Sequence, residues 1–406
     1  MLGRVFRRAS LEVLVAGGGV AALETALGLR ALARDRLRLT LVAPNDDFVY
    51  RPWAVAAPFG RRKARRLSLA VVAGDVGAVL EHDTVASVDH RRRVLHTGSQ
   101  RELPYDALVI AVGARPTEVP AGALTLNDRS MSEDLPRLME DIENGSVDSV
   151  AFVVPSLTTW PLPAYEVALL TREHAREKGI ELDVTIITAE AKPLAVFGDQ
   201  ASAGVAEVLS AAGVQTLAGT SAEMRSGELI MHPSERHVRF DRVVAVPQLV
   251  GPAIAGLPAD ADGFLPITAH AQVSGVERVY AAGDATDFAV KQGGIAAQQA
   301  DAAAESIAAL AGLGGPPKPF DTHIHGMLLA GRENNQDRYL YLSAHLEGGV
   351  ARDSRISETP TGSPVAKIAA RYLGPYLDKL WAASPPGGAP RHAWYFTDTV
   401  DTGLHE

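Results

Sequence analysis

The feature that most restricts the fold is a glycine triplet near the start of the chain, Gly17-Gly18-Gly19, which lies between two apolar segments. Residues 11–16 form a short apolar run typical of a buried parallel strand, and residues 20–34 repeat apolar side chains at helical spacing. Residues 37–42 are a second β-rich run. A strand, a helix and a second strand in this order form a right-handed parallel unit, so the sequence predicts an α/β fold.

The triplet continues as Gly17, Gly18, Gly19, Val20, Ala21 and Ala22, which fits the pattern G-x-G-x-x-G/A. Gly17 allows the sharp turn from strand to helix, Gly19 lets the backbone approach a pyrophosphate, and Ala22 is small enough for close helix–strand packing. The free N–H groups and the dipole at the helix N-terminus favour negative charge. We therefore predict that these six residues form a dinucleotide-binding turn.

Composition limits the class of protein. The chain has 406 residues, which predicts two or three domains, and its balance of 47% hydrophobic and 21% charged residues is typical of soluble proteins. A net charge of -9 argues against a nucleic-acid binder. The absence of cysteine excludes disulfides, thiolate chemistry and cysteine-ligated metals. The basic start, Met1 to Arg8, lacks the unbroken apolar run of a secretory signal, so we interpret it as a frayed tail and expect a cytoplasmic protein.

A second strand–helix–strand unit occupies residues 150–188, with a strand at 150–154, a helix at 164–178 and a strand at 182–188. The remaining expected elements are a strand at 108–112, a helix from Ser132 to Gly145, short strands at 243–246 and 279–282, and an alanine-rich helix at 292–311. We therefore expect two Rossmann-like dinucleotide-binding domains and a C-terminal α+β region. The resemblance described next implies that these are FAD/NAD(P)-binding domains, with residues 9–125 and 265–318 in a discontinuous first domain, 126–264 in the second and 319–406 in the C-terminal region.

Three sequence blocks in order resemble the FAD-dependent pyridine nucleotide-disulfide oxidoreductase superfamily. They are the first glycine turn, residues 105–116 (YDALVIAVGARP) and residues 279–284 (VYAAGD). The resemblance implies that Asp284 contacts the ribityl chain of FAD, that the chain passes beside the cofactor near Gly113, and that the helix near 292 points its N-terminus at the flavin. The acid that commonly ends the second strand is missing, so either Asn45 or Asp46 replaces it or the ribose is held less directly.

The candidate contacts outside the first turn share a position in or beside these blocks. They are Arg51, Pro52, Val85, Ala111, Gly113, Gly283, Asp284, Lys291, Gln292 and Ala296. Lys291 is the candidate catalytic residue, although a solvated surface lysine explains it equally well. A helix cap is the alternative for Asp284.

Two absences narrow the chemistry. Residues 48–53 correspond to the segment where disulfide reductases of this superfamily carry a cysteine pair, and they contain none. The second strand–helix turn, residues 155–163, contains three prolines and no glycine, so a pyrophosphate cannot approach its backbone closely. Trp160 could fill that space. The chain is most similar to the sulfide:quinone oxidoreductase and type II NADH dehydrogenase branch, but cysteine-dependent sulfide oxidation is excluded.

The leading prediction is an FAD-dependent oxidoreductase that passes electrons to a quinone or another small acceptor. An NAD(P)H dehydrogenase with an atypical turn, and a redox-inactive FAD-binding sensor or partner module, stay open. Both electron donor and acceptor are expected to be small molecules, and a homodimer is left open.

The C-terminal region predicts a helix from Ser363 through Trp381, which we expect to pack on the flavin domain or a dimer interface rather than on a membrane. His323 and His325 share a strand face. No third ligand is evident beside them, so we predict a structural role and no metal site. The aromatic tail around His392 is interpreted as core or interface.

Overall fold

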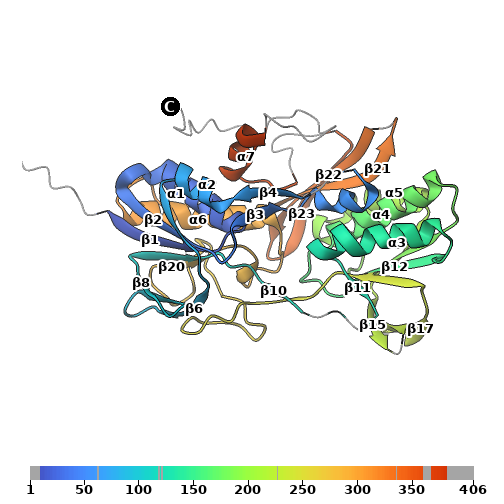
Figure 1. The fold of residues 1–406 in the computed structure, drawn as a ribbon, viewed down its shortest axis with the longest axis horizontal. Coiled ribbons are helices and arrows are strands. Elements are labelled where there is room, and N and C mark those ends of the chain that lie inside the picture. Colours follow the sequence, from blue (N-terminus) through green and yellow to red (C-terminus); the bar gives the residue numbers. More distant parts are fainter. Residues whose placement is uncertain are drawn as a thin grey trace, which may run out of the picture.

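The computed structural model describes residues 10–61, 64–117, 119, 122–225, 227–334, 336–359 and 367–381. The basic start, residues 363–366 and the aromatic tail around His392 lie outside these ranges. The described chain forms two halves of similar plan and a third sheet that contacts both (Figure 1). This architecture confirms the predicted α/β fold.

The first half is built on a five-stranded parallel sheet that runs in the order β20-β9-β1-β2-β5. Its strands are β1 (Leu11–Ala16), β2 (Leu37–Val42), β5 (Ala78–Glu81), β9 (Ala107–Ile110) and β20 (Val279–Ala281). The helices α1 (Val20–Ala33) and α6 (Gly293–Leu310) pack against each other and cover one face. The antiparallel strands β6 (Val85–Asp89), β7 (Val94–Thr97) and β8 (Glu102–Pro104) form the layer on the other face.

Side chains along β1 alternate between the two faces of the sheet, and this alternation explains the two layers. Val13 and Val15 belong to the helix-side core, whereas Leu14 and Ala16 belong to the core beneath the antiparallel layer. A strand covered on both faces needs apolar side chains at every covered position, which is why residues 13–16 are all apolar and buried.

The second half repeats this plan with a parallel sheet in the order β11-β18-β12-β13-β14. Its strands are β11 (Leu124–Thr125), β12 (Ser149–Val154), β13 (Asp183–Thr188), β14 (Val214–Leu217) and β18 (Arg242–Ala245). The helices α3 (Leu135–Glu143), α4 (Leu162–Glu177) and α5 (Asp199–Ala212) share a core with one face. The strands β15 (Ser221–Arg225), β16 (Glu228–His232) and β17 (Arg236–Val238) form the opposite layer.

The connections between the halves pair as the short antiparallel strands β10 (Arg115–Pro116) and β19 (Leu249–Val250). The first half also carries the hairpin β3 (Asp47–Tyr50) and β4 (Arg65–Ser68), the 3-10 helix η2 (Ala54–Phe59) and the short helix α2 (Leu69–Asp75). Because β11 joins the second sheet, residues 124–125 belong structurally to the second half and not to the first, where we had placed them.

The third sheet consists of the antiparallel strands β21 (His323–Glu333), β22 (Gln336–Glu347) and β23 (Val350–Ser357). Alternate residues of β21 contribute to different cores. Met327 and Leu329 pack with the first half, whereas Ile324 and Leu328 pack with α4 in the second. The sheet therefore joins the two halves into one apolar structure.

Three predicted boundaries were wrong. The helix predicted from Ser132 begins earlier, with a π-helical turn η3 at Ser130–Asp134 that Asn127 caps by accepting a hydrogen bond from the Ser130 N–H at 2.9 Å. The strand predicted to reach Val112 ends at Ile110, because the chain then leaves the sheet. The described part of the C-terminal helix, α7 (Leu373–Trp381), begins only at Leu373, and residues 367–372 are not helical.

Helix α7 packs on the first half, which is one of the two packing arrangements that we expected. Its Leu373, Tyr376 and Leu377 belong to the core that contains α1, and the Trp381 ring meets Tyr50 edge-on at 5.3 Å. Glu24, fully buried in α1, accepts hydrogen bonds from the backbone N–H groups of Tyr372 at 2.8 Å and Leu373 at 2.5 Å. Among the described residues, no helix is both long enough and apolar enough to cross a bilayer.

Candidate cofactor site

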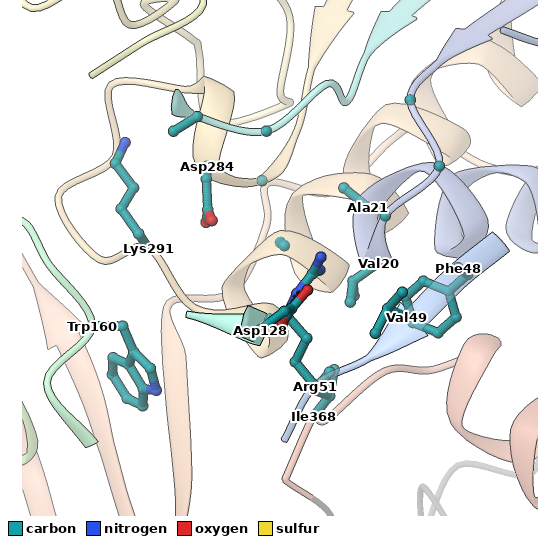
Figure 2. A pocket seen from close by; sticks show the side chains of 18 of the residues that line it. Val20, Ala21, Phe48, Val49, Arg51, Asp128, Trp160, Asp284, Lys291 and Ile368 are labelled. Carbon is teal, nitrogen blue, oxygen red and sulfur yellow. Dashed lines mark hydrogen bonds and ion pairs between the residues drawn. The ribbon is translucent and has the colours of Figure 1, made fainter. Parts of the chain in front are cut away.

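A cavity of about 1420 Å³ is lined by residues at the end of β1, at the start of α4 and on the third sheet. Ligand pockets in proteins commonly measure about 300–1,000 Å³, so this cavity has room for a ligand of dinucleotide size together with a smaller molecule. Figure 2 shows residues from both halves around it, with Asp284 and Lys291 from the first half and Trp160 from the second.

The glycine turn forms one end of the cavity. Gly17 has a φ of +135°, and a Cβ there would lie 2.1 Å from the Ala111 carbonyl oxygen, so only glycine fits. A Cβ on Gly19 would meet no protein atom within 4 Å, because that side faces the cavity. No side chain caps the N-terminus of α1, so its free N–H groups remain available to an anion.

Gly283 and Asp284 follow β20 in a 3-10 turn, η5 (Gly283–Ala285). A Cβ on Gly283 would lie 3.2 Å from the Ala21 Cβ and 3.4 Å from the Ala296 Cβ, so this glycine permits close packing of the turn on α1 and α6. The Asp284 carboxylate points into the cavity (Figure 2). Burial raises the pKa of Asp284, and the charge of Lys291 partly offsets this. The cap of α6 is Gln292, which accepts from the Ile295 N–H at 3.0 Å, so Asp284 does not serve as that cap.

Lys291 is not a solvated surface lysine, because only 6% of it is exposed. Its Nζ donates a hydrogen bond to the Thr286 carbonyl oxygen and lies 3.7 Å from the centre of the Phe264 ring. Burial lowers the pKa of Lys291 to about 8, against the opposing charges of Asp284 and Asp287. The lysine therefore stays protonated at neutral pH beside the Asp284 carboxylate and the cavity.

The structure brings nearly all predicted contacts to this one cavity. Arg51, Pro52 and Val85 line it, as do Ala111, Gly113, Gly283, Asp284, Lys291, Gln292 and Ala296 and the turn residues Gly17, Gly18, Gly19, Val20 and Ala21. Ala22 does not reach the cavity, because it is fully buried in the core between α1 and the sheet. Asn45 and Asp46, the alternatives for the missing ribose acid, both line the same end.

The second half presents a different surface to the cavity. Trp160, Leu162 and Pro163 line it at the start of α4, and the Trp160 ring packs edge-on against Phe197 at 5.7 Å. The N-cap of α4 is Pro161, and a second proline lies within its first turn. Proline has no N–H to donate, so this helix N-terminus offers an anion fewer donors than α1 does.

A buried ion pair between Glu166 and Lys367 is the main feature of the site that the sequence analysis missed. The Lys367 Nζ donates to the Glu166 carboxylate, which also accepts from the Leu329 N–H at 2.8 Å. Only 1% of Glu166 and 8% of Lys367 are exposed, and both residues line the cavity. Burial raises the pKa of Glu166, and Lys367 opposes that rise. A lone glutamate inside the apolar run of residues 162–170 was the available signal for Glu166, whereas nothing in the sequence pairs it with residue 367.

Two further lining residues come from outside the predicted set. Asp128, at the start of the second half, holds the predicted contact Arg51 through two oxygens, each 2.8 Å from the Arg51 Nε (Figure 2). His325 enters from β21. Burial, and the neighbouring His323, lower the pKa of His325 to about 4, so this imidazole is neutral at pH 7.

These features fit a flavin dinucleotide. Open space at Gly19 and uncapped N–H groups suit a diphosphate, a carboxylate at the end of β20 suits a sugar hydroxyl, and a buried lysine lies further along the cavity. Bound there, the flavin would supply the electron transfer, while the protein residues orient it and set the charge around it.

Comparison with solved structures gives the same fold. The sulfide:quinone oxidoreductase of Aquifex aeolicus superposes with a TM-score of 0.76 at 19% identity, covering 86% of this chain and 87% of the other. The ferredoxin reductase for the CYP199A2 system of Rhodopseudomonas palustris gives 0.60 at 20% identity, with 82% of each chain covered. An NAD-dependent persulfide reductase from A. fulgidus gives 0.59 at 19% identity, covering 83% of this chain and 65% of that one.

No curated protein sequence matches the chain significantly. The family model for pyridine nucleotide-disulphide oxidoreductases matches residues 11–304, which include both parallel sheets and all of α1 and α4. Because this match covers well over half of the sequence, the chain belongs to the pyridine nucleotide-disulphide oxidoreductase family, a family of flavin-dependent oxidoreductases.

Proposed function

We propose that this oxidoreductase holds FAD non-covalently and passes electrons from it to a quinone or a similar small apolar acceptor, without a cysteine relay. The observation that carries the proposal is the contrast between the two ends of the cavity. The end at Gly19 suits a diphosphate, whereas the end at Trp160 is apolar and rich in proline, yet contains the buried Glu166–Lys367 pair.

The acceptor class follows from what the second end offers. A quinone is flat and apolar and needs protons as well as electrons when it is reduced. The rings and aliphatic side chains of Trp160, Leu162 and Met327 suit such a molecule. Glu166, whose pKa is raised by burial, is a titratable group within the cavity wall through which a proton can pass, and the Lys367 ammonium holds it in place. NAD(P)H is disfavoured because its pyrophosphate would meet the prolines that begin α4.

The predicted FAD contacts have separate roles under this proposal. Gly17, Gly18 and Gly19 form the diphosphate turn, and Asp284 accepts from the ribityl hydroxyls. Lys291 places a positive charge near the flavin ring, where electrons arriving on the ring add negative charge. The chain has no cysteine, so no dithiol stands between the flavin and its partners.

The test begins with the absorption spectrum of the purified protein, which should show bound flavin. The flavin is then reduced anaerobically and mixed rapidly with a water-soluble short-chain quinone, or with NAD⁺. We expect the quinone, and not NAD⁺, to restore the oxidised flavin spectrum on the time scale of rapid mixing.

Prompt bleaching of the oxidised protein by NADH or NADPH would instead establish an NAD(P)H dehydrogenase. Bound flavin that exchanges electrons with no donor or acceptor would indicate a sensor or partner module. A protein that stays colourless after incubation with FAD overturns the proposal entirely.

A further inference from the structure

The third sheet carries a cluster of three polar side chains beside the cavity wall. His323 begins β21, His345 lies directly opposite it on β22, and Asp321 lies two residues before His323. The possible ligand atoms of these three side chains all lie within 4.8 Å of one another. The sequence showed the pair His323 and His325 but no third ligand. In the structure the second imidazole is instead His345, and the carboxylate is Asp321.

The distances within the cluster are longer than those of direct hydrogen bonds and leave space for an ion. The His345 Nδ1 lies 3.3 Å from one Asp321 oxygen, and the His323 Nδ1 lies 3.7 Å from the other. N–H···O hydrogen bonds span about 2.7–3.2 Å, so both separations are long for one. Ligands about 2.0–2.1 Å from a tetrahedral zinc lie roughly 3.3 Å from each other. The separation between Asp321 and His345 therefore already matches that of two zinc ligands, and the other separations are within reach of it by rotation of the side chains.

The backbone holds these positions before any ion arrives. The Leu346 N–H donates to the Thr322 carbonyl oxygen at 3.0 Å, and the Gln298 side chain donates to the His323 carbonyl oxygen at 2.7 Å. The side chains keep room to rotate, because 43% of the His323 side chain, 34% of that of His345 and 62% of that of Asp321 are exposed. An ion from solution can reach them, and small rotations about the side-chain bonds bring the imidazoles together.

We propose that Asp321, His323 and His345 bind one divalent transition-metal ion, with Zn²⁺ as the ion whose geometry fits best. Two imidazole nitrogens and one carboxylate oxygen suit Zn²⁺, Ni²⁺ or Cu²⁺ and disfavour Mg²⁺ and Ca²⁺, which prefer oxygen ligands. Three protein ligands leave a fourth position for water or an anion. The ion ties the segment that leaves α6 to β22, so its binding stabilises the junction between the first half and the third sheet.

The test uses protein without a polyhistidine tag, freed of metal by a chelator and then dialysed. Calorimetric titration with ZnCl₂ should show one ion bound per chain, and MgCl₂ should give no binding. His345→Ala and Asp321→Asn should each weaken Zn²⁺ binding at least about tenfold, since each removes one of three ligands. The control is His237→Ala. His237 is another exposed histidine beside a carboxylate, with its Nδ1 3.2 Å from Glu228, and this variant should bind Zn²⁺ as the wild type does.

A second measurement separates this site from other histidines. Saturating Zn²⁺ should raise the melting temperature of the wild type and of His237→Ala, and leave that of His345→Ala unchanged, because ligands that bind only the folded state stabilise it. Flavin absorbance of each variant checks that it folds. The proposal is overturned if the wild type binds no Zn²⁺, if Mg²⁺ binds equally well, or if His345→Ala binds Zn²⁺ as tightly as the wild type.

Discussion

The two halves place a strand, a turn and a helix in the same order, yet the turns are opposite in character. The first turn, after β1, is three glycines with open space beside Gly19. The second, after β12, runs through two prolines and Trp160 before α4 begins, and a third proline lies in the first turn of α4. The hydrophobic pattern that builds each sheet is shared, so the sheet does not decide what is bound. The few residues between strand and helix decide whether a pyrophosphate can approach.

The comparison extends one turn further into each helix. Glu24 and Glu166 are each the fifth residue of their helix, and both are fully buried and bound by the C-terminal region. Glu24 accepts hydrogen bonds from two backbone N–H groups, whereas Glu166 accepts a hydrogen bond from the Lys367 ammonium in the cavity wall. Glutamate at the same helix position is therefore enclosed in the core in the first half, whereas in the second half it lines the cavity.

The largest expected effect tests the two turns directly. Gly19→Val should weaken FAD binding more than about 100-fold, because the new side chain fills the space that the diphosphate needs, while its Cβ meets no protein atom within 4 Å. The matched substitution in the second turn, Ser156→Val, should keep full flavin content. Flavin absorbance per chain and an FAD titration measure both, and circular dichroism confirms the fold. Full flavin in Gly19→Val would contradict the assignment of the first turn.

The second effect concerns the glutamate of the second half. Glu166→Gln keeps the shape of the side chain but can no longer take up or release a proton, so reoxidation of the flavin by a quinone should slow by about 10²-fold, a magnitude typical of lost acid–base catalysis. Flavin content should not change. Stopped-flow reoxidation in Glu166→Gln, with Glu24→Gln as the matched control, measures the difference. If flavin reoxidation slows equally in Glu166→Gln and Glu24→Gln, then Glu166 supports the fold and takes no part in proton transfer.

The third effect concerns the glutamate of the first half and its dependence on pH. Glu24→Gln should lower the free energy of unfolding by about 1–3 kcal/mol, because its buried hydrogen bonds are disturbed. Burial raises the pKa of Glu24 from 4.5 to about 7. The folded state therefore binds more protons than the unfolded state between these values, and the wild type loses stability as the pH rises through that range. Urea unfolding measures the difference in free energy of unfolding between the wild type and Glu24→Gln, and this difference should become smaller as the pH rises. A difference that does not change with pH would contradict the raised pKa of the buried Glu24.

The smallest effect concerns the ion pair that joins the halves. Arg51 and Asp128 are both exposed, so Arg51→Gln should change the free energy of unfolding by less than about 1 kcal/mol. Its effect on FAD binding should also be far smaller than that of Gly19→Val. A loss of flavin comparable to that in Gly19→Val would show that the bridge, and not the glycine turn, controls the cavity.

Local patterns predicted the parts of the molecule that depend on neighbours in sequence. The strands and helices around the first turn follow from apolar periodicity, and the site residues near Gly283 followed from resemblance to the family. Contacts between segments that are far apart in the sequence could not be predicted from local patterns. Nothing local pairs Glu166 with Lys367, or His323 with His345, because tertiary packing alone brings them together. The early start of the helix at Ser130 was missed because Asn127, not Ser132, provides its cap.

The bonds from Glu24 to Tyr372 and Leu373 bear on how the protein is assembled during synthesis. Lys367 and Ile368, just before these anchored residues, form part of the cavity wall. They leave the ribosome after both halves and the third sheet, and domains generally fold as they emerge. This part of the wall is therefore completed after the rest of the cavity, and we expect a cofactor to enter more easily before it is in place. Once in place, it is expected to slow the release of a bound cofactor.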